Sequence, residues 1–314
     1  MATSGTSTFN ATRNEIVRQA ALLLNAVPLQ QTMGSALLEA FVFMLNAMVK
    51  SWAATGIHLW TVTEATLFPV AGQVRYSAGT GATDHITQTF YETSITTTEV
   101  AGQTVLSVDS TTNMTVADNI GIVLDDGSLQ WTTISSKTST TVTVATALTD
   151  DAAAANAVFN YTSKIVRPLK VVDARRYNID GGTDTPMTVC SRQEYRNLPL
   201  KTQAGMPIQM FYDAQLTLGY FNLWQVPDTT TELVKFTWHR PIEDFNTSAD
   251  NPDLPQEWIL PLVYNLAKLK MPSHPVDAQR RQDINDTADA LLAAMVGFDR
   301  ENESIFISPD REGY

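Results

Sequence analysis

The segment Ile120-Gly-Ile-Val-Leu-Asp-Asp-Gly-Ser-Leu-Gln-Trp-Thr-Thr-Ile134 consists of two apolar runs separated by a short polar turn. Asp126-Gly127 within the turn is a strong hairpin signal, because tight hairpin turns need residues that tolerate a positive φ. The surrounding residues 91–161 are dense in Thr, Ser and Val, a composition typical of strands. This region therefore predicts a small β-sandwich or barrel domain inserted into a parent fold.

Strand character continues on both sides of the insert. Residues 68–90 form a connecting β segment, and residues 162–250 carry further short apolar runs separated by Gly, Pro, Asp and Asn, which is the pattern of successive strands. Four of these runs predict two hairpins, 208–212 with 215–218 and 220–224 with 233–238. We expect an antiparallel β-sheet that carries the insert.

The first part of the chain, residues 1–67, predicts two helices. Thr12 and Glu15 have the spacing of a capping box, in which each side chain satisfies a backbone N–H at the start of a helix. Apolar residues follow at helical spacing until Pro28, which ends the first helix. The main apolar face of the second helix is formed by Leu37, Phe41, Met44, Leu45, Met48 and Trp52.

The second helix has another apolar face, which consists of Leu38, Val42 and Val49. A helix that is apolar on two sides packs against two partners. One partner is its own core, and the other is either a neighbouring subunit or more of the same chain. Leu38, Val42 and Val49 are therefore candidates for contacts between subunits, and complete burial within one chain is the open alternative.

The last part of the chain also predicts helices, over residues 251–297. Asp253-Leu-Pro-Gln-Glu-Trp258 reads as a helix start, because Pro is favoured at early helical positions and Glu complements the positive end of the helix. A final helix is expected from about Pro275 to Val296. Residues 298–314 show neither helical nor strand periodicity, and such a tail is either frayed or held by a partner. The fold class is thus α+β.

Charge and composition narrow the class of protein. The chain has 314 residues with 21 Lys and Arg against 33 Asp and Glu, which gives a net charge of -12, and affinity for nucleic acid depends mainly on clustered Lys and Arg. Residues 91–161 hold eight acidic residues against Lys137 alone. The most apolar stretch, 36–49, is interrupted by Glu39 and Asn46, so we expect no membrane span. The first residues lack the pattern of a secretory signal, and Cys190 is the single cysteine.

Recognisable catalytic chemistry is missing from the sequence. The four histidines are far apart and form no metal-ligand pattern, and neither a P-loop nor a nucleophile elbow occurs. Asp125-Asp126 lacks the spacing of a calcium loop, and a hairpin turn explains it better. We therefore expect no catalytic, cofactor or metal site.

Several segments, taken in their order along the chain, resemble the head-to-tail adaptor family of short-tailed, podovirus-like bacteriophages, also called tail accessory factors. They are Glu15-Ile-Val-Arg-Gln-Ala-Ala-Leu22, Leu45-Asn-Ala-Met48 with Trp52, Gly56-Ile-His-Leu-Trp60, Leu223-Trp-Gln-Val-Pro227, Arg240-Pro-Ile-Glu-Asp-Phe245, Asp253-Leu-Pro-Gln-Glu-Trp258, Asn265-Leu-Ala267, and Phe298-Asp-Arg-Glu301 with Ser304. The resemblance covers residues 10–80 and 165–314, and the β-rich middle departs from the minimal family pattern.

The resemblance implies a helical adaptor core whose copies form a ring, usually of twelve, beneath the portal protein. It also implies an extended tail, residues 298–314, that docks onto the portal. The side chains of that tail that become docking candidates are Phe298, Asp299, Glu301, Ser304, Ile305, Phe306, Ile307 and Tyr314. A portal protein, a tail nozzle protein and tail fibres are the implied partners, and DNA would pass through the ring without specific binding.

The resemblance further implies a place in the neck of the virion, after assembly in the host cytoplasm, and no enzymatic activity. Three alternatives stay open at this point. The chain could be the tail nozzle itself, a fibre-attachment or receptor-binding tail protein, or a muralytic tail enzyme. The role of the inserted domain is also open between contact with fibres, contact with the next tail ring, and widening of the collar.

Overall fold

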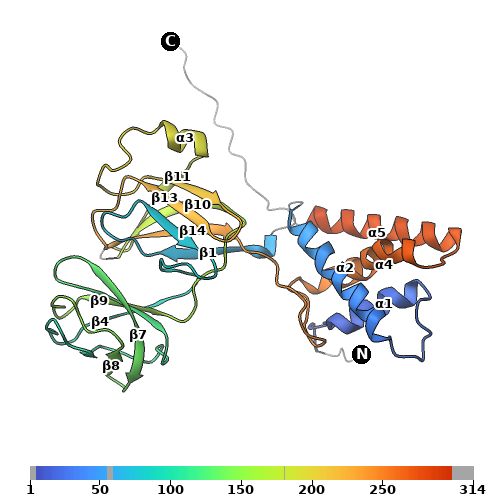
Figure 1. Cartoon of the computed structure of the whole chain (residues 1–314), viewed down its shortest axis with the longest axis horizontal. Coiled ribbons are helices and arrows are strands. Elements are labelled where there is room, and N and C mark those ends of the chain that lie inside the picture. Colours follow the sequence, from blue (N-terminus) through green and yellow to red (C-terminus); the bar gives the residue numbers. More distant parts are fainter. Residues whose placement is uncertain (1–4, 55–58, 180, 299–314) are drawn as a thin grey trace, which may run out of the picture. The chain divides into compact units, whose positions relative to one another are not determined.

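The computed structural model describes residues 5–54, 59–179 and 181–298. The chain divides into two units, one formed by Met1–Thr61 with Ile242–Tyr314 and the other by Val62–Pro241. The described part of the first unit is helical, and the second is built mainly of strands (Figure 1). The protein is therefore of the mixed α+β class that the sequence predicts.

The helical unit combines helices from both parts of the sequence. Its elements are α1 (Arg13–Leu23), α2 (Ser35–Ala54), η1 (Leu59–Thr61), η2 (Gln256–Trp258), α4 (Ile259–Lys270), η3 (Met271–Ser273) and α5 (Ala278–Phe298). The predicted capping box is confirmed, because the Glu15 carboxylate accepts the Thr12 backbone N–H at 2.7 Å and the Thr12 hydroxyl accepts the Glu15 backbone N–H. Pro261 lies in the first turn of α4, where its missing N–H breaks no intrahelical bond.

Three tryptophans join the two parts of the helical unit. The ring of Trp258 is fully buried and lies 5.5 Å from that of Trp52 and 5.1 Å from that of Trp60, measured between centroids. The returning chain is fixed to α2 by a reciprocal pair of hydrogen bonds, in which the Asn46 amide donates to the Phe245 carbonyl at 3.2 Å and accepts the Phe245 N–H at 2.9 Å. Side chains over 190 residues apart in sequence thus share one core.

In the described part of the strand unit, eight strands form one sheet in the order β2-β13-β12-β11-β10-β14-β1-β3. Their bounds are β1 (Val62–Leu67), β2 (Arg75–Ala78), β3 (Ile86–Thr87), β10 (Lys170–Asn178), β11 (Thr183–Val189), β12 (Gln209–Ala214), β13 (Gly219–Trp224) and β14 (Glu232–His239). All neighbouring strands are antiparallel except β11 and β12, which pair in parallel over two residues after the short helix α3 (Arg192–Asn197).

This sheet curls into a nearly closed barrel. The terminal strands β2 and β3 are joined by residues 79–85, and Asp84 from this connection accepts the backbone N–H and the hydroxyl of Ser77 in β2, both at 2.6 Å. At the open edge of the sheet, the Asp84 carboxylate thus accepts a backbone N–H of β2 that would otherwise lack a partner strand. The apolar side chains of the eight strands form a core of their own.

Residues 91–161, all of which the structure describes, form a second sheet in the order β4-β9-β6-β7-β8-β5. Its strands are β4 (Tyr91–Ser94), β5 (Val105–Ser107), β6 (Asn119–Val123), β7 (Leu129–Lys137), β8 (Thr141–Val144) and β9 (Ala157–Tyr161). A bridge between Ile95 and Val108 links the two ends of the sheet, so it also nearly closes around a separate core. The predicted hairpin is confirmed, because β6 pairs with β7 and Gly127 has φ +82.

The sequence predictions for residues 208–238 are partly wrong. Residues 215–218 form the turn after β12 rather than a strand, and β12 pairs with β13. The predicted hairpin of 220–224 with 233–238 does not form, because β13 pairs with β12 and β2 while β14 pairs with β1 and β10. Strand runs that are adjacent in sequence often pair, but here the closing of the barrel assigns both strands to distant partners.

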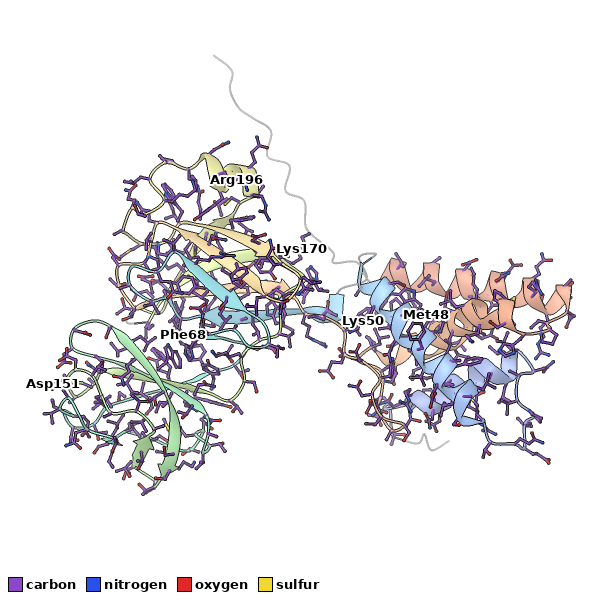
Figure 2. The ribbon with its side chains drawn as sticks, in the orientation of Figure 1. Met48, Lys50, Phe68, Asp151, Lys170 and Arg196 are labelled. Atoms are coloured by element: carbon purple, nitrogen blue, oxygen red, sulfur yellow. The ribbon has the colours of Figure 1, made fainter. Side chains whose placement is uncertain are left out.

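An aromatic cluster joins the two sheets of the strand unit. It centres on Phe68, labelled in Figure 2, whose ring lies 5.0 Å from Trp131 and 5.3 Å from Phe159. His85 stacks on Trp131 at 4.0 Å with an interplanar angle of 4°, and its Nδ1 lies 2.6 Å from the Tyr161 hydroxyl. The pKa of His85 is lowered to about 3, mainly because the ring is buried and secondly because the positive charge of Lys164 lies nearby.

We predict that Gly121→Ala weakens the strand unit by about 1–3 kcal/mol, the usual cost of overpacking. A Cβ on Gly121 would lie 2.9 Å from the rigid Trp131 ring, so the indole must move and lose its stack on His85. Urea unfolding monitored by circular dichroism measures the loss. In a Trp131→Ala background the same glycine substitution should cost almost nothing, and an equal cost in both backgrounds would contradict the steric explanation.

We also predict that His85 makes the strand unit sensitive to acid. Unfolded His85 binds a proton near its ordinary value of 6.5, whereas the folded pKa is about 3. The unfolded state therefore holds more protons between these values, and the contribution of His85 to stability is lost as the pH falls from about 6.5 to about 3. His85→Asn should reduce the drop in unfolding free energy between pH 7 and pH 4.5. Equal drops in both proteins would show that His85 has no part in it.

Candidate functional site

Both units expose large apolar side chains, and on the helical unit three of these lie on or beside α1, α2 and α4. Phe43 on α2 is 72% exposed, Phe9 before α1 is 71% exposed and Leu260 on α4 is 52% exposed. Single exposed apolar residues are common on any protein surface. Here Phe9 and Leu260 border a groove between two helices and Phe43 lies among exposed alanines, and apolar patches of this kind are typical of sites that contact another molecule.

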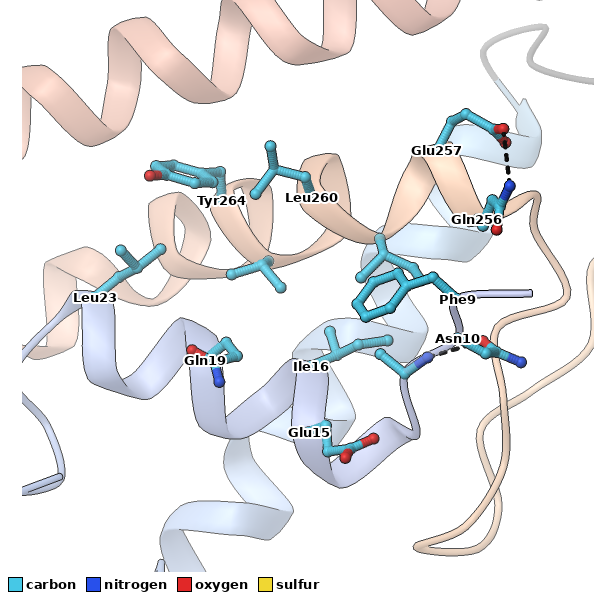
Figure 3. Close-up of a pocket in the computed structure, with 13 residues that line it drawn as sticks. Phe9, Asn10, Glu15, Ile16, Gln19, Leu23, Gln256, Glu257, Leu260 and Tyr264 are labelled. Carbon is cyan, nitrogen blue, oxygen red and sulfur yellow. Dashed lines mark hydrogen bonds between the residues drawn. The ribbon is translucent and has the colours of Figure 1, made fainter. Parts of the chain in front are cut away.

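A groove lies between α1 and α4, with a volume of about 750 Å³. Figure 3 shows the two helices running in the same direction, from Glu15 and Glu257 at one end to Leu23 and Tyr264 at the other. The groove is lined by Phe9, Asn10, Ala11, Glu15, Ile16, Gln19, Leu23, Gln256, Glu257, Ile259, Leu260, Val263 and Tyr264. Its floor is apolar and its mouth is bordered by exposed Phe9 and Leu260.

One end of the groove is acidic. The Thr12 backbone N–H and hydroxyl donate to the Glu15 carboxylate and lower its pKa below the usual value, so Glu15 carries a full negative charge at neutral pH. Glu257 lies across the groove at the same end and is exposed. The opposite end has no charged side chain among the lining residues. The groove therefore presents an apolar floor with negative charge at one end.

The three predicted inter-subunit residues of α2 take different positions. Val49 is only 1% exposed and belongs to the core of the helical unit, so it cannot contact another subunit unless that core opens. Leu38 and Val42 are half-buried and pack against the same core. The periodicity groups Val49 with the outer face, but the core side of α2 is wider than one heptad stripe and includes it.

The outward side of α2 carries a residue that sequence reasoning missed, Phe43. It lies on a face with Ala36, Ala40 and Ala47, all exposed. The spacing of these four positions is helical, and a single large aromatic side chain among alanines is the signal that could have identified the face. Lys50, labelled in Figure 2, lies near its C-terminal end and forms an ion pair of 2.7 Å with Asp244.

Among the residues that the structure describes, α2 is the one helix long and apolar enough to cross a membrane, over Ser35–Ala53. Its inner face, which includes Phe41, Leu45 and Met48, packs in the core of the helical unit. A core helix passes the same test of length and composition, and part of the apolar character of α2 is explained by that packing.

The predicted portal-docking tail falls almost entirely outside the described residues. Phe298, the last described residue, ends α5 and is 65% exposed. The other tail candidates, Asp299, Glu301, Ser304, Ile305, Phe306, Ile307 and Tyr314, lie outside the described residues.

Groups that could support other chemistry are dispersed in the described part of the chain. No cluster of three His, Cys, Asp or Glu side chains that could hold a metal ion occurs there. His85 is occupied by its stack on Trp131, and Cys190 is buried with its Sγ 3.5 Å from the Met210 carbonyl oxygen. A second concavity of about 640 Å³ in the strand unit is lined mainly by polar side chains of β4 and nearby loops, including Glu92, Asp109 and Asn156.

The comparisons with known proteins add no family to these observations. No family model matches the chain, and no curated protein sequence matches it. The helical unit offers two features on which a function can be built, the groove that is acidic at one end and the exposed Phe43 face.

Proposed function

We propose that this chain is a structural protein of a bacteriophage virion, a head-to-tail adaptor. Copies of it would form a ring between the portal and the tail nozzle, and DNA would pass through that ring during ejection. In this proposal the helical unit, which contains the outer parts of the two stretches that resemble the adaptor family, is the adaptor core. The insert of residues 91–161, which the minimal family pattern lacks, would be an elaboration of the protein.

One observation carries the proposal most directly. The helical unit has two separate apolar surfaces, the groove between α1 and α4 and the outward face of α2 around Phe43. A ring made of identical copies needs two different contact surfaces on each copy, because each subunit meets its two neighbours through opposite sides of one repeated interface. A small body with two unlike apolar surfaces meets that need.

The charge of the chain supports passage of DNA without retention. The net charge is -12, and the only lysine of residues 91–161, Lys137, donates to the Thr111 carbonyl at 2.8 Å. Weak or repulsive electrostatic interaction with phosphate leaves few points at which DNA would be held. A conduit for DNA benefits from such walls.

We predict that the full chain stacks on purified portal rings in negative-stain electron micrographs. The triple variant Ile305→Asp/Phe306→Asp/Ile307→Asp should reduce the stacked fraction by roughly tenfold or more, since burial of each apolar side chain contributes about 1.5–3 kcal/mol. The matched control Asn302→Ala/Glu303→Ala/Ser308→Ala changes three polar positions of the same tail and should stack as the unmodified chain does.

One result would contradict the adaptor proposal, and another would contradict only the docking role of the tail. If the unmodified chain fails to stack on portal rings but binds nozzle rings or host cells, it is a nozzle or receptor-binding protein. If the apolar triple variant stacks as well as the unmodified chain, the tail is not the docking element.

A further inference from the structure

We propose that the Phe43 face of α2 packs into the groove between α1 and α4 of a second copy of this chain. The inference rests on the proposed ring and names the contact that would build it. The molecule that would occupy the groove is α2 of an identical chain. The contact is heterologous, because the two surfaces that meet are different.

The dimensions of the two surfaces correspond. Ile16 and Leu23, at the two ends of the α1 side of the groove, are seven residues apart, which is roughly 10 Å along a helix. Ala40 and Ala47 on α2 are also seven residues apart, with Phe43 between them. Helix-in-groove recognition uses apolar side chains at such intervals. Phe43 is the large side chain available to enter, and Leu260 and Phe9 border the mouth that would receive it.

The charges of the two surfaces give the contact a direction. No ionisable residue occurs on α2 from Ala40 to Val49, and the stretch is bounded by Glu39 at one end and Lys50 at the other. The groove is negative at the end where Glu15 and Glu257 lie. Lys50 therefore belongs at that end, which places α2 of one copy antiparallel to α1 and α4 of the next.

Lys50 can share its charge with this contact. Its Nζ donates to the Ile242 carbonyl and forms an ion pair with Asp244, and the Lys50 and Asp244 side chains are about half exposed. Ion pairs between exposed side chains contribute little to stability, so exchanging or sharing one costs little. The opposite orientation of α2 would bring Glu39 to the acidic end of the groove, where like charges repel.

The groove cannot be filled by α2 of the same chain. Phe41, Leu45 and Met48 hold the inner face of α2 in the core that it shares with α1 and α4. The face that carries Phe43 points away from that core, as its 72% exposure indicates. A second copy is therefore the molecule that brings this face and this groove together, and repetition of the contact produces a ring or an open chain of subunits.

Sedimentation of the full chain over a range of concentrations tests the contact, without any portal protein. The unmodified chain should associate as its concentration rises. Phe43→Asp and Leu260→Asp should each abolish this association. An equimolar mixture of the two variants should restore a dimer and nothing larger, because one variant keeps its groove and the other keeps its Phe43 face.

Leu29→Asp is the matched control. Leu29 is as exposed as Phe43, at 72%, and belongs to neither surface, so this variant should associate like the unmodified chain. Circular dichroism and thermal unfolding of all variants show whether the substitutions leave the fold unchanged. If one variant does not fold, a milder substitution at the same position, Phe43→Ser or Leu260→Ser, is tested in its place. The same results are expected for it.

Several results would overturn the inference. They are a monomer at every concentration up to the limit of solubility, unchanged association of Leu260→Asp, or a mixture of variants that remains monomeric. Flotation with phosphatidylcholine and phosphatidylglycerol vesicles that is lost in Phe43→Asp but kept in Leu260→Asp would identify α2 as a membrane contact instead. Because no portal is present, self-association can fail while portal binding succeeds, and the reverse.

Discussion

The contact of Trp258 with Trp52 and Trp60 is the interaction on which the helical unit depends. In the sequence, Trp258 follows the first two helices and all the strands of the second unit. The reciprocal bonds between Asn46 and Phe245 and the ion pair of Lys50 with Asp244 then secure the returning segment on α2. Together with the apolar residues that α1, α2 and α4 bury against one another, the tryptophan contacts hold α4 beside α1 and so form the groove between them.

The dependence of the fold on contacts between residues far apart in the sequence explains which features could be predicted. Local features could be predicted, and the partners of distant segments could not. The capping box of Thr12 and Glu15 and the turn at Gly127 depend on residues within four positions of each other, and both occur as the sequence predicts. The partners of β14, by contrast, are β1 and β10, which lie about 170 and 60 residues earlier in the chain. Alternation of apolar residues specifies which face of a strand is buried, but it does not specify the neighbour.

In the candidate site, too, the local features could be predicted from the sequence and the long-range ones could not. Periodicity identifies α2 as apolar on more than one side, yet it assigns Val49 to the outer face and passes over Phe43. The burial of Val49 and the exposure of Phe43 depend on how much of α2 is covered by α1 and α4. The sequence of α2 alone does not contain this information. The groove itself needs Ile16 and Leu260 on adjacent helices, and a separation of some 240 residues hides that proximity from any local pattern. The tail candidates beyond Phe298 remain predictions.

The way in which the insert is attached has a consequence for how such a protein can change over evolutionary time. Tyr91, at its beginning, pairs directly with Asn160, near its end, so the chain leaves and re-enters the larger barrel at neighbouring points. A module joined in this manner can be exchanged for another without lengthening or twisting the parent strands. The exchange has one condition. The incoming module must present an aromatic face like that of Trp131 and Phe159 to Phe68 and His85, which favours replacement among domains that already share this surface.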